Sequence, residues 1–243
     1  MVGRGPVLQG LPRLAADGRA VLSEVGWLSR MPDDFREAVF ANMSFRKAEA
    51  GIEFLHADDS NAGLFGIAQG CVEIGFVEGH PETRSMHLAY AGFWGGYKTL
   101  LGQARFISMQ ARTDVLWGFV PRLGLERLLT ENPQWWRHIL ALADEMVSVA
   151  LVGFADLTRH SSEVRAIAVL LRLADCRYRD PPEDLVPEIR ISQFDLAAMA
   201  VMSRNTFNAI MNKLVERHLV EIGYRSIFLK NPSALRSIVH ADY

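Results

Sequence analysis

Short apolar runs separated by turn residues dominate the chain between about Met43 and Phe119. Glycines and small polar clusters recur there roughly every eight to twelve positions, a spacing typical of turns between short strands. This pattern predicts an all-β roll, barrel or sandwich. The runs with the length and composition of strands are Leu64–Ala68, Val72–Val77, Arg84–Ala89 and Val115–Val120.

The apolar period changes to that of helices after this region. Leu123–Thr130 predicts a short helix, and Pro133 opens a longer one at the first-turn position where proline is favourable. The long helix extends to about residue 159, roughly 40 Å at 1.5 Å per residue. Its apolar residues alternate in steps of three and four, as in the a/d seam of a coiled coil. They are Leu140, Ala143, Val147, Ala150, Phe154 and Leu157.

An apolar seam of this length has two interpretations. The helix packs on its own domain, or it meets the same helix of a second copy in a parallel dimer. We favour the dimer, because a seam on so long a helix more often meets a partner helix. Gly153 lies inside the helix and costs about 1 kcal/mol relative to alanine. Close approach of the partner backbone or a local bend would explain it.

The C-terminal third begins with a helix and a loop. Ser161 and Ser162 followed by Glu163 predict a capped helix start with an acidic first turn, and the helix continues to about Ala174. The polar segment 175–187 contains three prolines, which predicts a loop.

The pattern of a winged helix-turn-helix follows this loop. Ser192 caps a short helix, and Ala200–Met202 forms a tight turn. Ser203 then caps a second helix, Arg204–Arg217, and two short strands joined by the turn Gly223–Arg225 complete the pattern.

The outer face of the second helix has the side chains that DNA recognition uses. It carries Arg204, Asn205, Asn208 and Asn212. Arginine bonds guanine O6 and N7 as a fork, and asparagine pairs with adenine N6 and N7. Hydroxyls and free amides at the helix start can hold a phosphate. The predicted DNA-binding residues are Gln193, Ser203, Arg204, Asn205, Thr206, Asn208, Lys213, Tyr224 and Arg225.

We expect these residues to have different roles. Arg204 and Asn205 should read bases, with Asn208 as a weaker candidate. Backbone or wing contacts should come from Ser203, Thr206, Lys213 and Arg225.

Local charge sets this segment apart from the rest of the chain. Between Ser203 and Arg236, six basic residues stand against two acids, a net charge of +4, whereas the whole chain of 243 residues carries −2. The remaining sequence therefore carries −6. A basic module on an acidic body is the electrostatic pattern of a DNA-binding domain rather than of an ordinary solvated helix.

The order of the segments resembles the Crp–Fnr superfamily, the cyclic-AMP receptor and fumarate–nitrate-reduction regulators. The similarity extends roughly from Trp27 to Asn231. Its most specific pieces are Leu196–Met199 followed by Ser203–Thr206, and Gly95–Arg105. The resemblance implies a homodimeric bacterial transcription regulator. In that family an N-terminal effector domain and a long dimer helix position two winged helices on a palindromic site.

Three positions depart from the pattern of this family. Arg204 corresponds to the base-reading arginine, but Asn205 stands where many members have glutamate, and Ala209 where many have a second arginine. The operator should therefore differ from the common half-site. Val201 stands where glycine or asparagine is usual in the turn, and a β-branched residue disfavours positive φ.

The resemblance also implies where an effector would bind. Cyclic-nucleotide-binding members clamp the ribose phosphate with a cassette between two strands, and the matching stretch here is Phe93–Phe106. Arg105 corresponds to the phosphate arginine, whereas Gly96 replaces the ribose glutamate and Phe106 a phosphate-contacting serine. Ala150 and Leu151 replace dimer-helix residues that reach the adenine. The effector-pocket candidates are Gly95, Gly96, Arg105, Phe106, Ala150 and Leu151.

The missing contacts argue against cyclic AMP as the effector. Each lost hydrogen bond to a charged or buried partner costs about 1–3 kcal/mol. The apolar replacements leave two alternatives open: a pocket filled by the protein itself, or one suited to a hydrophobic or aromatic ligand. A small-molecule effector therefore stays an open partner.

Composition excludes several other kinds of protein. Hydrophobic residues make up 49% and charged residues 22% of the chain, which predicts a packed core. The two cysteines, Cys71 and Cys176, are too few for a four-cysteine cluster and too distant for a CxxC pair. A buried structural role for Cys176 is favoured over oxidation sensing. Motifs of common enzymes, such as a P-loop, HExxH or GxSxG, are absent, so no enzyme is expected.

Membrane and cofactor functions are not expected either. The longest runs without charged residues, Ser60–Val72 and Ser85–Tyr97, have about thirteen residues, against roughly 20 for a spanning helix. The N-terminus has no long apolar segment, so it is not read as a signal peptide. No metal or cofactor is predicted, because no histidine spacing singles out a haem ligand. The candidates considered were His56, His80, His87, His138 and His160.

The sequence thus predicts an α+β protein. We expect a flexible leader at 1–26, a β-roll sensory domain at 27–131, a dimerisation helix at 132–160 and a winged helix-turn-helix at 161–243. The partners expected are double-stranded DNA, a second copy and, for an activator, RNA polymerase, in the cytoplasm. The alternative is a ligand-sensing module with a weak or vestigial DNA-binding domain.

Overall fold

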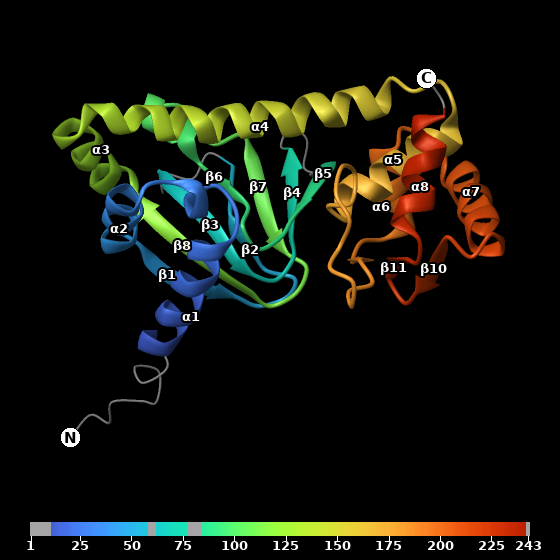
Figure 1. The fold of residues 1–243 in the computed structure, drawn as a ribbon, viewed down its shortest axis with the longest axis horizontal. Helices are drawn as coiled ribbons and strands as arrows, with labels where there is room; N and C mark the ends of the chain where they lie inside the picture. Colours follow the sequence, from blue (N-terminus) through green and yellow to red (C-terminus); the bar gives the residue numbers. More distant parts are fainter. Residues whose placement is uncertain (1–10, 58–61, 77–83, 242–243) are drawn as a thin grey trace. The chain divides into compact units, whose positions relative to one another are not determined.

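The structure is a computed structural model that describes residues 11–57, 62–76 and 84–241. The chain forms two compact units, Met1–Met146 and Val147–Tyr243, and their boundary lies inside the long helix (Figure 1).

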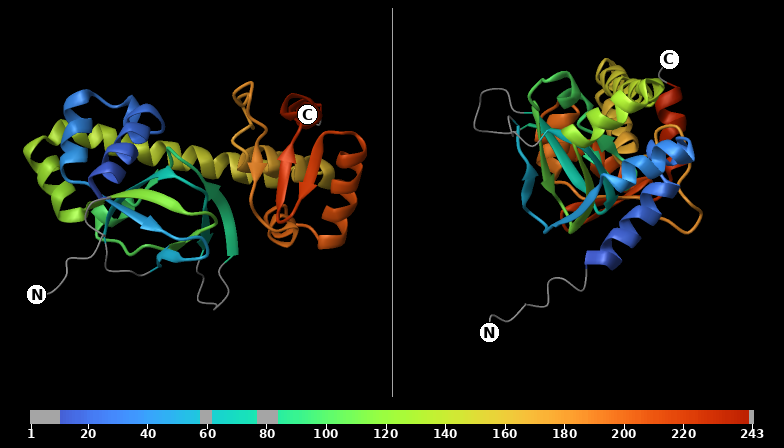
Figure 2. Two further views of the ribbon diagram at one scale, coloured as in Figure 1. Left: turned by 90° about the horizontal axis from the view of Figure 1, so that it is seen from below. Right: turned by 90° about the vertical axis from the view of Figure 1, so that its left-hand side faces the viewer.

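Two four-stranded antiparallel sheets form a β-roll in the N-terminal unit (Figure 2). Their strand orders are β1-β8-β3-β6 and β2-β7-β4-β5. The prediction of a β-roll is confirmed, and the predicted strands correspond to β3, β4, β5 and β8. Val77, at the end of one predicted strand, lies outside the described residues. The strands are β1 (Ser44–Ala48), β2 (Glu53–Leu55), β3 (Gly63–Gln69), β4 (Val72–Phe76), β5 (Arg84–Ala89), β6 (Trp94–Gly95), β7 (Ile107–Ala111) and β8 (Val115–Pro121).

Apolar side chains from both sheets fill the space between them. Phe65, Trp117 and Phe119 come from one sheet, and Ile74 and Met109 from the other, and all five are buried. The interior of the roll is therefore a packed aromatic and aliphatic core.

Helices cover the other side of the first sheet. They are α1 (Leu11–Glu24), the 3₁₀ helix η2 (Leu28–Arg30), α2 (Asp33–Ala41) and α3 (Arg122–Glu131). The cassette between β6 and β7 contains a second 3₁₀ helix, η3 (Tyr97–Leu101).

Residues 11–24 differ from the flexible leader that the sequence predicts for 1–26. They form α1, which packs against β1, β3 and β8. Leu14, Val21 and Leu22 lie on one side of this helix because positions i, i+7 and i+8 share a helical face. Leu22 is fully buried, and the other two pack against the same core. Burial of this face holds the helix on the sheet.

Aromatic rings fasten the start of the long helix to this unit. Trp27, Phe35 and Trp135 form edge-to-face pairs, with centroids 5.7 Å apart for Trp27–Phe35 and 5.4 Å for Phe35–Trp135. The indole Nε1 of Trp27 donates a hydrogen bond of 2.9 Å to the carbonyl oxygen of His138. The imidazole of His138 is buried here, and burial, aided by Arg137 and opposed by Asp34, lowers its pKa.

The long helix begins with the 3₁₀ turn η4 (Pro133–Trp135) and continues as α4 (Trp136–Leu157), close to the predicted 133–159. The segment Pro133–Leu157 is strongly apolar. Its most apolar stretch of 18 residues has a mean hydropathy of 1.6, and only 17% of that stretch is buried. By length and composition alone this helix could span a membrane, which counting charge-free runs does not reveal.

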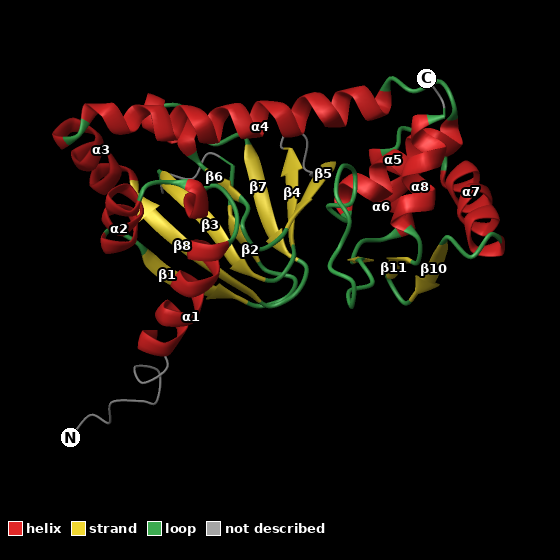
Figure 3. Cartoon of the chain, viewed as in Figure 1, coloured by secondary structure: helices red, strands yellow, loops and turns green. Residues whose placement is uncertain are grey.

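The C-terminal unit is helical, with one small sheet of order β10-β11-β9 (Figure 3). Two helices joined by a short turn are followed by a hairpin, so the predicted winged helix-turn-helix is confirmed. The elements are α5 (Ser162–Leu173), β9 (Glu188–Ile189), α6 (Gln193–Met199), α7 (Arg204–Glu216), β10 (Val220–Gly223), β11 (Ser226–Leu229) and α8 (Pro232–His240).

Helices α5, α6 and α7 end in the same unusual way. The second residue after each helix is left-handed without being glycine: Asp175 (φ 57°), Val201 (φ 50°) and His218 (φ 56°). The next amide bonds a carbonyl one turn back, as in a Schellman motif. These bonds are Cys176 N to Leu171 O (2.7 Å), Met202 N to Ala197 O (3.0 Å) and Leu219 N to Leu214 O (2.9 Å).

Val201, in the turn between α6 and α7, therefore adopts the left-handed conformation that a β-branched side chain disfavours. In the described part of the N-terminal unit, by contrast, every residue with positive φ is a glycine.

A buried carboxylate ties the end of α4 to the C-terminal unit. Asp156 is 1% exposed, and its oxygens lie 3.4 Å from Nε of Arg172 and 3.1 Å from Nε of Arg177. Burial lowers the pKa of Arg172, and the charge and hydrogen bond of Asp156 oppose that shift. Removal of one member of such a buried group leaves a charge without compensation.

Candidate nucleic-acid interface

Two capped helices form the core of the candidate interface. The Oγ of Ser192 accepts a 3.1 Å hydrogen bond from the amide of Asp195 at the start of α6. In the same way, Oγ of Ser203 accepts from the amide of Thr206 at the start of α7, also at 3.1 Å. These caps fix where both helices begin, because they satisfy an amide that has no partner inside the helix.

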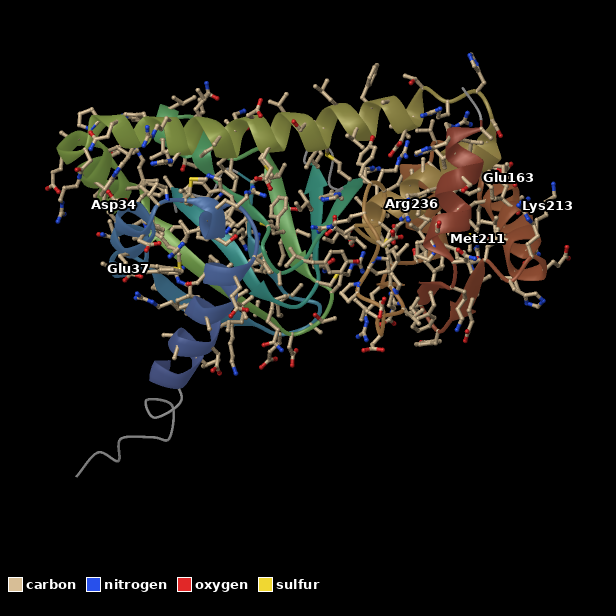
Figure 4. The ribbon with its side chains drawn as sticks, viewed as in Figure 1. Asp34, Glu37, Glu163, Met211, Lys213 and Arg236 are labelled. Atoms are coloured by element: carbon tan, nitrogen blue, oxygen red, sulfur yellow. The ribbon has the colours of Figure 1, made fainter. Side chains whose placement is uncertain are left out.

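Helix α7 has a buried face and an opposite exposed face. The buried side chains are Phe207, Ile210, Met211 and Leu214. At 100° per residue, Asn205, Ala209 and Asn212 lie opposite them, and all three are exposed. Lys213 lies on the outer side of the helix in Figure 4, away from Met211.

The structure divides the six basic residues of this segment into two groups. Three are paired with acids: Arg217 with Glu163 at 3.2 Å, Lys230 with Glu221 at 3.2 Å, and Arg236 with Asp180. The other three are Arg204, Lys213 and Arg225, and none has an ion-pair partner among the described residues. These three lie on the outer flanks of α7 and at the wing tip, so uncompensated positive charge is concentrated where DNA would be bound.

The wing is a tight hairpin with two conspicuous side chains. Gly223 pairs with Ser226, which leaves Tyr224 and Arg225 as the turn. Tyr224 is 93% exposed. Arg225 has φ 53°, in a region that favours glycine. Such strain is often retained at functional sites.

An open cleft of about 350 Å³ lies between the start of the two helices and the wing. Gln193 and Arg204 line it from the helices, and Arg225 and Ser226 from the wing. Phe194, which the sequence analysis did not single out, also lines it and is 67% exposed.

Most predicted DNA-binding residues thus lie on one side of this unit, in the cleft or on exposed parts of α7 and the wing. Asn208 is the exception to the predicted outer face. It is half-buried, and its Oδ1 is buried without a hydrogen-bond partner among the described residues. The reason is geometric, since Asn208 lies 100° beyond its buried neighbour Phe207, at the edge of the exposed face.

The backbone of the cassette leaves no room for a side chain at Gly95 or Gly96. Gly96 has φ 94°, and a Cβ there would lie 2.1 Å from the carbonyl oxygen of Gly63. A Cβ at Gly95 would lie 2.6 Å from Cζ of Phe65. A glutamate at position 96 therefore does not fit this backbone.

The remaining effector candidates differ in burial. Arg105 is buried, at 4% exposure. Phe106 is 41% exposed and packs edge-to-face on Phe76, with Nζ of Lys98 4.0 Å from its ring centroid. Ala150 and Leu151 are exposed on α4.

The predicted seam lies along the exposed side of α4. Leu140, Val147, Phe154 and Leu157 are 69, 51, 68 and 37% exposed. Ala150 is also exposed, and Ala143 is half-buried. Leu151 at 61% belongs to the same stripe. Leu151 is predicted above as an effector-pocket residue alone, although its i+4 spacing from Val147 also places it on the seam.

The surroundings of Cys176 favour a structural role over oxidation sensing. Cys176 is 1% exposed, its Sγ lies 3.2 Å from the carbonyl oxygen of Ala174, and burial raises the pKa of its thiol. These are features of an unreactive thiol. Among the described residues, no three His, Cys, Asp or Glu side chains are grouped as metal ligands. His80, one haem candidate, lies outside them.

Comparison with known proteins finds relatives both of this unit and of most of the chain. Residues 164–238 match the family described as a Crp-like helix-turn-helix domain. The HTH-type transcriptional regulator Cmr of Mycobacterium tuberculosis is 22% identical over 228 residues, which cover 90% of this chain and 89% of Cmr. A CRP/FNR-family transcriptional regulator of Thermus thermophilus has a similar structure. Its TM-score is 0.63 at 18% identity, with 82% of this chain and 100% of that chain covered.

One further relative is similar over a short segment only. Lysophospholipase NTE1 of Yarrowia lipolytica is 35% identical over 77 residues, which is 31% of this chain. The match covers 5% of the lysophospholipase. Nothing about the activity of that enzyme transfers to this chain.

The chain has the fold of the Crp–Fnr regulators, and its residues 164–238 are a Crp-like helix-turn-helix domain.

Proposed function

We propose that this protein binds duplex DNA as a homodimer, at a two-fold symmetric site whose half-site centres lie about one helical turn, roughly 34 Å, apart. The observation that carries the proposal is the concentration of unpaired basic residues, Arg204, Lys213 and Arg225, around α7 and the wing. Arg204 reads a base, and Lys213 and Arg225 hold the backbone. Gln193, Ser203, Thr206 and Tyr224 add contacts.

The exposed seam on α4 supports the homodimer. Large apolar side chains such as Leu140 and Phe154, each about two-thirds exposed, are unfavourable in water. Their spacing matches a coiled-coil seam, so a second copy of α4 covers them. The nearest atom to a Cβ at Gly153 would be Cζ of Arg172 at 3.7 Å, an ordinary contact, so packing within the chain does not require glycine at this position.

A membrane-spanning role for the same helix is less favourable. Asp144 and Glu145 lie near its middle, and Glu145 is paired with Arg30 on the β-roll. An acid at the centre of a bilayer costs about 2.5–3.5 kcal/mol. We therefore assign the apolar surface to a partner helix, in a protein of the cytoplasm.

The DNA-binding proposal is tested by selecting duplexes from a random pool with purified full-length protein and no added ligand. We expect a palindrome with half-sites one turn apart. Arg204→Ala should weaken binding to it about 10- to 100-fold, the value of a forked base contact. Lys213→Ala should reduce the slope of affinity against salt by about one.

The matched control is Arg127→Ala, which removes an exposed arginine of α3 and should leave affinity unchanged. If Arg204→Ala has no effect, or no duplex is enriched, the DNA-binding proposal is wrong. The protein would then be the alternative kind, a ligand-sensing module with a vestigial DNA-binding domain.

The dimer has its own test. Val147→Glu and Phe154→Glu should give monomers in sedimentation equilibrium, because two like charges would face each other across the seam. Leu123→Glu changes an equally apolar residue that is 76% exposed on α3 and should leave the dimer intact. A dimer that survives both seam variants would place the interface elsewhere.

We further propose that DNA binding does not depend on cyclic AMP. The support is the closed cassette at Gly95 and Gly96 and the filled interior of the roll. Titration calorimetry should detect no cyclic-AMP binding, and added cyclic AMP should leave DNA affinity unchanged. An increase in affinity on its addition would refute this part. Whether RNA polymerase is contacted depends on where the sites lie in promoters.

A further inference from the structure

Over its first nine residues, the surface of α7 most remote from its core is a narrow stripe of uncharged side chains, which Glu216 continues at the end of the helix. Asn205, Ala209 and Asn212 lie at i, i+4 and i+7, directly opposite the buried residues. Neither carboxamide makes a hydrogen bond to another described residue, so both are available to a ligand. The basic residues occupy the two flanks instead: Arg204 lies toward the cleft and the wing, and Lys213 lies on the other side.

The chemistry of this stripe matches one kind of base pair. An asparagine carboxamide pairs with N6 and N7 of adenine in the major groove, and an alanine methyl contacts the C5-methyl of thymine. Guanine is read by arginine or lysine, and cytosine by an acid, and the stripe from Asn205 to Asn212 has none of these.

The length of the stripe sets how many base pairs it can reach. Seven residues at 1.5 Å each span about 10 Å, or about three base-pair steps of 3.4 Å. Ala209 lies between the two asparagines. Its short side chain leaves room for a thymine methyl where a longer residue would reach the base edge itself.

We propose that Asn205, Ala209 and Asn212 form an adenine- and thymine-reading face, so that each half-site contains a run of about three A·T pairs next to one G·C pair read by Arg204. This inference rests on the proposed function, because it names the DNA sequence that the same site recognises.

The first test is the composition of the selected palindrome. We expect A·T pairs at about three adjacent positions of each half-site. Asn205→Ala and Asn212→Ala should each relax the preference at one of these positions and weaken binding about 10- to 100-fold. Ala209→Arg should convert the preference at one position from A·T to G·C. A gain of preference cannot result from misfolding.

The second test changes single atoms of the selected duplex. Replacing an adenine read by asparagine with 7-deazaadenine removes only the N7 acceptor and should weaken binding about tenfold. Replacing the thymine read by Ala209 with uracil removes one methyl and should weaken binding about fourfold, the equivalent of one buried methyl group. In Ala209→Gly the uracil penalty should disappear.

The control variant is Gln134→Ala, which removes an exposed carboxamide from the N-terminal unit and should change neither affinity nor base preference. A selected palindrome whose contacted positions are mainly G·C overturns this inference while the proposed function stands. The same holds if 7-deazaadenine and uracil are tolerated at every position. If no duplex is enriched, both the inference and the proposed function are wrong.

Discussion

Replacing Val201 by glycine should stabilise the C-terminal unit by about 1 kcal/mol. A residue with a Cβ pays about 1–2 kcal/mol in the left-handed region, and a β-branched residue lies at the upper end. Glycine removes this strain but has more freedom in the unfolded chain, which opposes the gain by about 0.4–1 kcal/mol. Val201 is 66% exposed, so little apolar burial is lost. The bond from Met202 N to Ala197 O is made by the backbone and stays.

Related positions provide an internal scale. Val201→Ala keeps a Cβ and removes only the branching, so it should gain clearly less than glycine. His218→Gly should also gain less, because histidine is among the residues that tolerate positive φ better. The expected order of stabilisation is therefore Val201→Gly above both other variants.

The distribution of tryptophan makes the assay specific to one unit. All five tryptophans lie at or before Trp136. In urea, tryptophan fluorescence therefore follows the N-terminal unit, whereas circular dichroism at 222 nm reports the helices of both units, so a change seen only by circular dichroism belongs to the C-terminal unit. The circular-dichroism midpoint should rise and the fluorescence midpoint should stay. An unchanged midpoint in Val201→Gly, or an equal gain in Val201→Ala, would refute the strain argument.

Three other outcomes follow from the structure. Asp156→Asn should destabilise the C-terminal unit by about 3 kcal/mol in the same urea assay, because Arg172 and Arg177 lose the charge that compensates them; an effect below about 1 kcal/mol would contradict this. Because the pKa of His138 is lowered in the folded protein, the unfolded chain binds a proton more readily. The N-terminal unit should therefore lose stability as the pH falls through and below 6.5. His138→Leu should flatten this pH dependence in unfolding followed by fluorescence. Gly96→Glu should lower the fluorescence midpoint without creating cyclic-AMP binding in calorimetry, because its Cβ would lie 2.1 Å from the carbonyl oxygen of Gly63.

Periodicity predicts the described strands and helices well where tertiary contacts reinforce it. The long helix and the capped helices α6 and α7 begin within a residue or so of their predicted starts, because proline and serine mark these positions locally. Helix α1 was missed, since Leu14, Val21 and Leu22 form a face too sparse to stand out without the sheet that buries it.

Which basic residues of the C-terminal unit are paired with acids could not be predicted from the sequence. Counting residues gives a net charge of +4 for the segment, but not which cations are free. Arg217 and Arg236 are paired with Glu163 and Asp180, which lie 54 and 56 positions away along the chain. Only the fold brings these groups together. The partial burial of Asn208 likewise depends on what packs beside α7.

Asp156 couples the end of α4 to the helix that follows it. It lies between the seam residues Phe154 and Leu157 but points the opposite way, into the C-terminal unit, where two arginines hold it. A rotation of α4 at these seam residues should therefore move α5 as well, because Asp156 on α4 contacts Arg172 on α5. Flexibility of the connector between α4 and α5 would not uncouple the two helices, because this contact joins them directly. In the proposed dimer, a rearrangement along the seam would therefore also move the C-terminal unit.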